Sequence, residues 1–422
     1  MGESAFPGEL AVPLGGEKVS TGWLVVFGST LALIVGNGPI ILFTFGVLLQ
    51  PISAEFGWQR SVLASAVVTS HVTGALAMPF VGTVVDRVGV RRIALPAIVI
   101  FALATASGGL LGASPIAFIL LYGFLGIVGA GHSTLTYGRV VSTWFDGRRG
   151  LALGVTLAGI GIGAALMPKY THYFVAAYDW RHAYFALGAL LLLVAFPSVA
   201  LFVRERPRQD RIEMVTAEGL TLGQALRGYR FWFAAAAMMF AAAAINGTIA
   251  HIVPILVDRG IAAGTATTAV AAAGLSLIIG RILSGLALDR FYGPYVAAFF
   301  FLVPLAGMMM LGIGATGPLA VVAAVLLGLG IGAEGDIMAY LTSRYFGMAH
   351  YGVVYGCILA FFTLGSGLGP WIMAHAFDAN RSYATGLIGL GLALLAAVML
   401  VISLGAYRYP PRERSRRSAP QP

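Results

Sequence analysis

Apolar residues occur along this chain in long blocks separated by short polar segments. A helix needs about 20 mostly apolar residues to cross a hydrocarbon core about 30 Å thick, and each block is close to that length or longer. Lipid offers no hydrogen bonds, and the blocks are too long and too continuous for barrel strands. The pattern therefore predicts an all-α membrane protein with twelve transmembrane helices. They cover approximately residues 23–49, 61–85, 93–112, 115–144, 150–168, 181–203, 231–257, 263–288, 294–314, 317–344, 351–376 and 383–406.

Composition excludes a soluble domain. Hydrophobic residues make up 59% of the chain and charged residues 10%, against roughly 25% charged residues in soluble domains. The single cysteine, Cys357, lies inside a predicted span, so no disulfide framework is expected. The first 20 residues contain no apolar core followed by a cleavage site, so we expect no removable signal peptide.

The basic residues are distributed unequally between the two sides of the predicted membrane protein. If both termini are cytoplasmic, 19 lysines and arginines lie on the cytoplasmic side and five on the other, and the remaining two, Arg139 and Arg281, lie within spans. An excess of this size indicates the cytoplasmic side of a membrane. We therefore expect a multi-pass protein of the cell inner membrane with both termini in the cytoplasm. The net charge of +9 follows from this bias and does not call for nucleic acid as a partner.

The two halves of the chain repeat each other. Gly82-x-x-x-Asp86-Arg87 follows the second predicted span, and Gly285-x-x-x-Asp289-Arg290 follows the eighth. Parallel six-helix repeats with a substrate site between them are a known transporter architecture. The predicted organisation is a tail (1–22), a six-helix bundle (23–203), a polar linker (204–229), a second, pseudo-symmetric six-helix bundle (230–406) and a basic tail (407–422).

The loop segment GTVVDRVGVRR, from Gly82 to Arg92, resembles the loop signature of the major facilitator superfamily, and GLALDRFYG is its degenerate copy. Within that superfamily the chain is most similar to the monocarboxylate and oxalate porters. The stretches GVLLQPISAEFGWQRS, from Gly46 to Ser61, and GRILSGLALDR, from Gly280 to Arg290, carry this similarity. The resemblance implies the major facilitator fold. It also implies gating residues on the cytoplasmic side, namely Asp86, Arg87, Arg91, Asp289 and Arg290.

Arg281 is the only charged residue in the apolar stretch 263–288. An arginine near mid-bilayer costs several kcal/mol at the low end of a contested range, and such residues face a watery cavity or a partner. The residue therefore predicts a negatively charged solute, and the resemblance implies that it contacts the substrate carboxylate. The alternative is an arginine neutralised permanently by an acid of the tenth span.

Glu334 and Asp336 are the only acidic residues deep within any predicted span. An intramembrane acid is functional by default and can take up a proton. The two residues are two positions apart, about 200° around a helix, so both cannot face one point. We expect one of them to exchange a proton beside Arg281 and the other to pack between helices, with a slight preference for Glu334 in the first role.

Several uncharged or weakly basic side chains are further candidates within the spans. His251 could relay protons, and hydrogen bonding between helices is the alternative role for all of these polar residues. No histidine has metal-ligand spacing with a cysteine or carboxylate, so neither a metal site nor a cofactor is predicted. The candidate cavity residues are Asn37, His132, Tyr137, Asn246 and Tyr340.

These features predict a monomeric secondary active transporter of a small organic monocarboxylate, driven by proton symport. Two departures from the related porters bear on this hypothesis. Leu277 stands where animal monocarboxylate porters often have an aspartate, and 351–376 contains no lysine such as the oxalate porter has. The alternative is an exchanger or efflux carrier for another anionic or aromatic metabolite. An enzyme is not expected, because no nucleophile, metal cluster or phosphate loop is visible near a membrane face.

Overall fold

The computed structural model describes residues 16–145, 149–205, 219–347 and 349–409. The side chains of 16–20, Pro79, Thr83, Asp86, 149 and 150 lie outside this description, as do the linker 206–218 and the basic tail 410–422. The predicted gating role of Asp86 and the arginines of the tail beyond 409 therefore fall outside the described residues.

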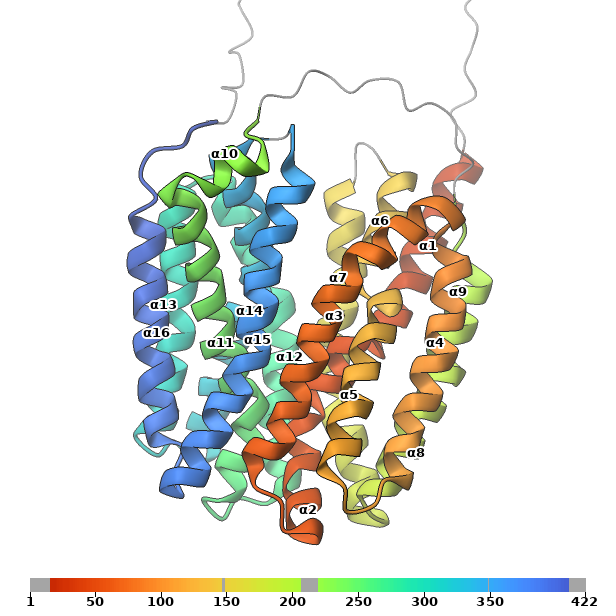
Figure 1. Cartoon of the computed structure of the whole chain (residues 1–422), viewed down its shortest axis with the longest axis vertical. Coiled ribbons are helices and arrows are strands. Elements are labelled where there is room, and N and C mark those ends of the chain that lie inside the picture. The colour runs from red at the N-terminus through yellow and green to blue at the C-terminus, as the bar shows by residue number, and fades with distance from the viewer. Residues whose placement is uncertain (1–15, 146–148, 206–218, 348, 410–422) are drawn as a thin grey trace, which may run out of the picture.

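The first six predicted spans form one bundle, on the right in Figure 1. Four of these spans change helix type within the membrane segment. The helices are α1 (Gly16–Ile34), η1 (Pro39–Phe43), α2 (Phe45–Phe56), α3 (Arg60–Val88), α4 (Val90–Ser107), η2 (Gly108–Leu110), α5 (Pro115–Gly129), η3 (Ala130–His132), α6 (Thr134–Trp144), α7 (Arg149–Ala177), α8 (Trp180–Leu190), η4 (Leu191–Ala195) and α9 (Phe196–Phe202).

The last six spans form the second bundle, on the left in Figure 1. Each of them is one continuous α-helix, although three (α11, α13 and α15) contain an internal proline. A short helix, α10 (Leu222–Leu226), precedes them. The spans are α11 (Tyr229–Val257), α12 (Ala263–Leu288), α13 (Gly293–Gly312), α14 (Gly317–Phe346), α15 (Tyr351–Asn380) and α16 (Ala384–Ile402).

The prediction of twelve transmembrane helices in an all-α fold is confirmed. Twelve helical segments of the described chain are long and apolar enough to cross a membrane. Both ends of the described chain lie on one side of the molecule, at the top of Figure 1, which we call the terminal side. The other side, where α2 lies and where α3 begins at Arg60, is called the opposite side.

Glycines bring the two bundles into close contact in the half of the molecule nearer the opposite side. The bundles meet where α7 packs on α12 and where α3 packs on α15. A Cβ at Gly274 would lie 2.4 Å from the backbone nitrogen of Ala165, and one at Gly161 would lie 2.5 Å from Ile278. A Cβ at Gly367 would lie 3.0 Å from His71. Small residues at these points allow the helix backbones to approach each other.

The same helix faces have no neighbour in the terminal half. Gly82, Gly154, Gly285 and Gly356 each lie about three turns along from a contact residue, on the same face of α3, α7, α12 and α15. Within the described residues, nothing lies within 4 Å of a Cβ placed on any of these four glycines. The bundles are therefore closed against each other near the opposite side and separated near the terminal side.

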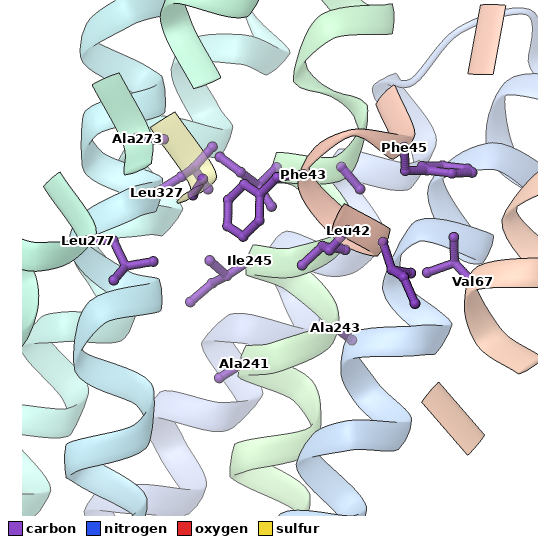
Figure 2. Close-up of a cluster of buried hydrophobic side chains, with 14 of the residues drawn as sticks. Leu42, Phe43, Phe45, Val67, Ala241, Ala243, Ile245, Ala273, Leu277 and Leu327 are labelled. Atoms are coloured by element: carbon purple, nitrogen blue, oxygen red, sulfur yellow. The ribbon is translucent and has the colours of Figure 1, made fainter. Parts of the chain in front are cut away.

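An apolar cluster reinforces the closed half. Figure 2 shows Leu42, Phe43 and Phe45 of the first bundle in one cluster with Ile245 of α11 and Leu277 of α12. All five side chains are at most 7% exposed. The cluster thus blocks the space between the bundles with hydrocarbon, and Leu277 forms its border one helical turn before Arg281.

This geometry predicts that Gly274→Ala lowers the thermal stability of the purified protein. The added methyl group would overlap the α7 backbone, and overpacking of this kind costs about 1–3 kcal/mol. Gly389→Ala is the matched control, because a Cβ at Gly389 on α16 meets nothing within 4 Å in the described structure. The expected result is a lower melting temperature for the first variant and an unchanged one for the second. Equal melting temperatures would show that the α7–α12 contact is not tight.

Candidate functional site

Arg281 lies where the contact between the bundles ends. It is on α12, on the face that brings Gly274 and Ile278 against α7. Its position is seven residues, about 10 Å, from the terminal-side end of the helix. The guanidinium therefore lies deep in the protein at the start of the separated half, on the terminal side of the apolar cluster.

The guanidinium of Arg281 has unused hydrogen-bond donors. Its Nε and Nη1 atoms are buried and have no hydrogen-bond partner among the described residues, and no carboxylate of the described chain lies within 4.0 Å of it. A buried charged donor without an acceptor costs more than a neutral one, which costs about 1–3 kcal/mol. The arrangement is therefore incomplete without an anion or water, and its planar fork suits a carboxylate.

Two polar side chains lie within electrostatic range of this guanidinium, and a third, Ser284, contacts one of them. Asp336 of α14 is close enough for its charge to interact with that of Arg281. The Ser284 hydroxyl, one turn along α12, lies 3.0 Å from its own helix's Arg281 backbone oxygen and 3.2 Å from Asp336 Oδ2, and it can donate to either. Tyr355 of α15 is within electrostatic range of both Arg281 and Asp336. Its ring stacks on Tyr351, with ring centroids 5.4 Å apart.

Glu334 lies elsewhere, inside the second bundle. It is 2% exposed. Its Oε2 accepts a long hydrogen bond, 3.5 Å, from Asn246 Nδ2, which also donates to Ser366 at 3.4 Å. Its Oε1 has no partner in the described structure. The slight sequence-based preference for Glu334 beside Arg281 is therefore wrong for this conformation: Asp336 is the nearer acid. The reason is the helix period, since the α12-facing side of α14 carries Gly328, Gly332 and Gly335.

The first span, predicted to be continuous, breaks between α1 and η1 because of a proline. Val35 O should accept a hydrogen bond from residue 39, but Pro39 has no N–H. His132 Nε2 supplies the missing contact at 3.3 Å from Val35 O. His132 comes from the short 3-10 segment η3 that interrupts the fourth span. The breaks in the first and fourth spans therefore meet in the middle of the first bundle, where His132 of one contacts the free carbonyl of the other.

His132 and Tyr137 are parts of this junction. Both side chains are 0% exposed, and His132 Nδ1 lies 2.6 Å from the Tyr137 hydroxyl. Asn37 lies beside them, packed against Gly129, and its Oδ1 is buried without a partner among the described residues. For His132 and Tyr137 the geometry favours a structural role over the predicted cavity role, whereas Asn37 keeps a free acceptor.

His251 belongs to a network that closes the opposite side. Its Nε2 contacts Pro370 O at 2.9 Å and its Nδ1 contacts the Tyr383 hydroxyl at 3.2 Å. That hydroxyl also accepts a hydrogen bond from Arg60 Nη1 at 2.5 Å. Arg60, of the first bundle, forms a bidentate ion pair with Asp258 of the second, at 2.7 and 3.0 Å.

Further contacts strengthen this closure. Asp378 accepts from the backbone nitrogens of Arg60 and Ser61 at the start of α3. Within the first bundle, Arg181 pairs with Glu55 of α2 at 2.7 Å. Hydrogen bonds from the Arg181 guanidinium, and secondly from the Trp180 indole, lower the pKa of the Glu55 carboxyl below its usual value. Helix α2 is thus held to its own bundle while it contacts α11 of the other.

The predicted gating residues of the terminal side are not engaged. Arg87, Arg91, Asp289 and Arg290 are all exposed, and none takes part in an ion pair within the described residues. Tyr340, predicted to contact the substrate, lies near this surface instead. Its ring packs against Gly293 and Tyr407 and lies 5.0 Å from the Arg344 guanidinium. It anchors the end of the described chain to the second bundle.

Sequence reasoning missed Ser284, Tyr355 and the Arg60–Asp258 pair. A serine or tyrosine in an apolar helix is common, so neither residue type carries a signal by itself. Asp258 and Arg60 lie at helix ends, where charged residues are expected in any membrane protein. A helical wheel of 277–288 would have found Ser284 near Arg281, since residues three apart share a face.

A buried cation beside an acid, between two bundles that are closed on one side only, defines a membrane transporter rather than an enzyme. The chain belongs to the major facilitator superfamily: the family model described as Major Facilitator Superfamily matches residues 22–370. Solved structures with this fold include a bacterial homologue of the human lysosomal transporter Spinster in an inward-facing and occupied conformation. It matches with a TM-score of 0.68 and 17% identity, over 92% of this chain and 97% of the other.

Characterised and uncharacterised relatives agree with this family. Monocarboxylate transporter 13 of Bos taurus is 25% identical over 91% of this chain and 89% of its own length. The MFS-type transporter YcxA of Bacillus subtilis is 29% identical over 57% of this chain, and monocarboxylate transporter 14 of Mus musculus is 30% identical over 40%. These two matches span 59% and 33% of the relatives' own lengths, less than two thirds of each.

The junction of the two helix breaks gives a prediction about stability. His132→Leu should lower the free energy of unfolding by about 1–3 kcal/mol, because it leaves the buried Val35 carbonyl without a donor. Adding Pro39→Ala should recover part of this loss, since alanine restores the backbone N–H at residue 39. The measurement is unfolding of the purified variants.

Tyr137→Phe is the control, because it removes only the second contact of the imidazole. If Pro39→Ala changes the free energy of unfolding by the same amount with histidine or with leucine at position 132, then His132 does not replace the missing donor.

Proposed function

We propose that this protein is a secondary active transporter that moves a small organic monocarboxylate together with a proton. The observation that carries the proposal is Arg281, a half-buried residue whose Nε and Nη1 atoms are buried without partners at the end of the inter-bundle contact. A guanidinium stays charged, so an incoming carboxylate gains a charge-assisted hydrogen bond that the empty site lacks. The names of the related monocarboxylate transporters support the same class of substrate.

The number of charges favours one carboxylate over two. Arg281 is the only basic residue of α12 and lies in the same region as Asp336, which would repel a second anionic group. A dicarboxylate bound at both ends would need a second cation facing the first. Tyr355 and Ser284 offer hydroxyl groups to a hydroxy acid or to the second carboxylate oxygen.

Asp336 is our proposed proton-coupling residue. In the empty site its negative charge partly neutralises Arg281, helped by the hydrogen bond from Ser284. When a substrate carboxylate reaches the guanidinium, two anions compete for one cation, and protonation of Asp336 removes the repulsion. Substrate and proton therefore favour each other's binding. Glu334 and the buried His251 remain secondary candidates for this role, because Glu334 contacts Asn246 of α11 and His251 contacts Pro370 of α15 and Tyr383, not Arg281.

Transport would proceed by alternating access between the two bundles. The described conformation is closed by the Arg60–Asp258 pair and open towards the terminal side. The 19-to-five distribution of basic residues supports a cytoplasmic terminal side and the inner membrane. In the reverse conformation, Arg87, Arg91, Asp289 and Arg290 would form the cytoplasmic gate, and the protein would act as a monomer.

A second candidate function is exchange or efflux of an aromatic anion. The stacked pair Tyr351–Tyr355 beside Arg281 favours it, since an aromatic ring could extend the stack while its carboxylate binds the guanidinium. Uptake into proteoliposomes with an imposed pH gradient separates the two functions. Symport predicts accumulation that collapses with an uncoupler, whereas exchange requires substrate on the inside.

Arg281→Lys should reduce monocarboxylate uptake by roughly 30-fold or more. Lysine keeps the charge but not the planar fork, and loss of one partner of a buried charged contact costs about 2 kcal/mol or more. Initial uptake rates in proteoliposomes provide the measurement. Arg227→Lys, at an exposed position after α10, is the control and should transport normally. Normal uptake by the Arg281 variant would exclude this residue from the substrate site.

Asp336→Asn should abolish pH-driven accumulation while preserving exchange of labelled for unlabelled substrate. The amide cannot release a proton but can still accept a hydrogen bond from Ser284. Glu334→Gln is the matched variant and should keep pH-driven accumulation, because its carboxyl group contacts Asn246 and not Arg281. The opposite result for the two variants would transfer the proton-coupling role to Glu334.

A further inference from the structure

The first bundle has a hollow on its outer surface, away from the candidate site. Its volume is about 490 Å³, and its lining is almost entirely apolar. Val35 of the α1 break, Leu166 of α7 and Val194 of η4 form its walls, and Lys169 and Tyr170 contribute the polar atoms. Every lining residue belongs to the first bundle, whereas Arg281 belongs to the second. The hollow is therefore separate from the site assigned to the substrate.

Two irregular helices create this hollow. The π-helix η4 (Leu191–Ala195), which includes Val194, widens the sixth span. The first span loses its regular path after Ile34, because Pro39 cannot donate to Val35. Regular helices would pack side chains into this space, and π-helical turns are frequent at functional sites. The hollow thus lies where two irregular helix segments meet α7.

Lys169 is the unusual residue of this surface. The predicted fifth span ends at residue 168 and so leaves Lys169 just outside it, but Lys169 lies inside α7, eight residues or about 12 Å before the helix ends at Ala177. It forms one exposed stripe with Leu166 and Tyr173, which are 51% and 64% exposed. No carboxylate of the described chain pairs with its amine. A lysine on the lipid-facing surface is costly unless its amine reaches the interface or an anion.

Tyrosines mark the level of the membrane interface close by. Tyr173 follows Lys169 by one turn, and Tyr178, also 64% exposed, lies just beyond the end of α7. Exposed tyrosines are enriched where hydrocarbon meets headgroups. Lysine has a long flexible stem, so the Lys169 amine can reach the depth of a lipid phosphate while the hollow lies at the depth of the acyl chains.

We propose that the hollow is a binding site for one anionic phospholipid. An acyl chain occupies the space between Val35, Leu166 and Val194, and the Lys169 amine contacts the phosphate. A basic side chain at the mouth and an apolar wall below match the two parts of such a lipid. The lipid would also contact Val35, whose carbonyl forms the junction with His132.

The test is lipid binding to the purified full-length protein, with phosphatidylglycerol and phosphatidylcholine of the same acyl chains as probes. Native mass spectrometry counts the bound lipids, and a thermal-shift titration gives relative affinity. The wild-type protein should prefer phosphatidylglycerol. Lys169→Gln should weaken that binding roughly fivefold, the effect of one basic residue near a membrane surface. Lys169→Arg should retain it.

Two further variants separate the headgroup contact from the hollow. Val194→Trp fills the space and should reduce binding of phosphatidylglycerol although the charge remains. Arg381→Asn removes a charge from the same side of the protein but outside the hollow and should change nothing; asparagine tolerates the left-handed backbone found there, with φ of 53°. Unchanged phosphatidylglycerol binding in either Lys169→Gln or Val194→Trp would overturn the proposal. So would equal affinity of the wild type for both lipids.

Discussion

The structure depends on one unfavourable charge in an apolar helix. The guanidinium of Arg281 cannot lose its proton, and two of its nitrogens have no acceptor within the described chain. Burial of such a group is tolerated only where a mobile anion or water can reach it. Its position, directly after the last α7–α12 contact and beside Asp336, makes access from the terminal side part of the stability of the fold and not only of its activity.

Around this charge, small residues and prolines determine which helices can move. Glycines on α3, α7, α12 and α15 allow backbone contact in one half of the molecule and leave space in the other. The closed half combines an apolar cluster with the Arg60–Asp258 pair, so both hydrophobic burial and a specific charged contact must be broken to open it. The terminal half carries paired loop motifs whose charged residues are exposed. Under the proposed transport cycle, these residues would form the alternative closure on the same helix faces.

Much of this arrangement could be predicted from the sequence, because membrane insertion makes helices easy to recognise. The apolar blocks predicted twelve spans, and the recurring loop motif predicted two bundles. The position of Arg281 within its span was also evident. The neighbours of Arg281 were not, since Asp336 and Glu334 differ only in which face of α14 they occupy, and that face depends on packing against α12. The breaks in α1 and α5 required knowledge of His132 meeting a carbonyl nearly one hundred residues away.

The proline in the first span has a mechanical consequence. A helix that lacks one hydrogen bond through temporary strain could rewind, but residue 39 can never supply its donor. The break in the first span is therefore permanent. The second segment of this span continues into α2, which is attached to α8 through Glu55 and touches α11 across the boundary between the bundles. The first span therefore connects the boundary between the bundles to Val35, in the centre of the first bundle.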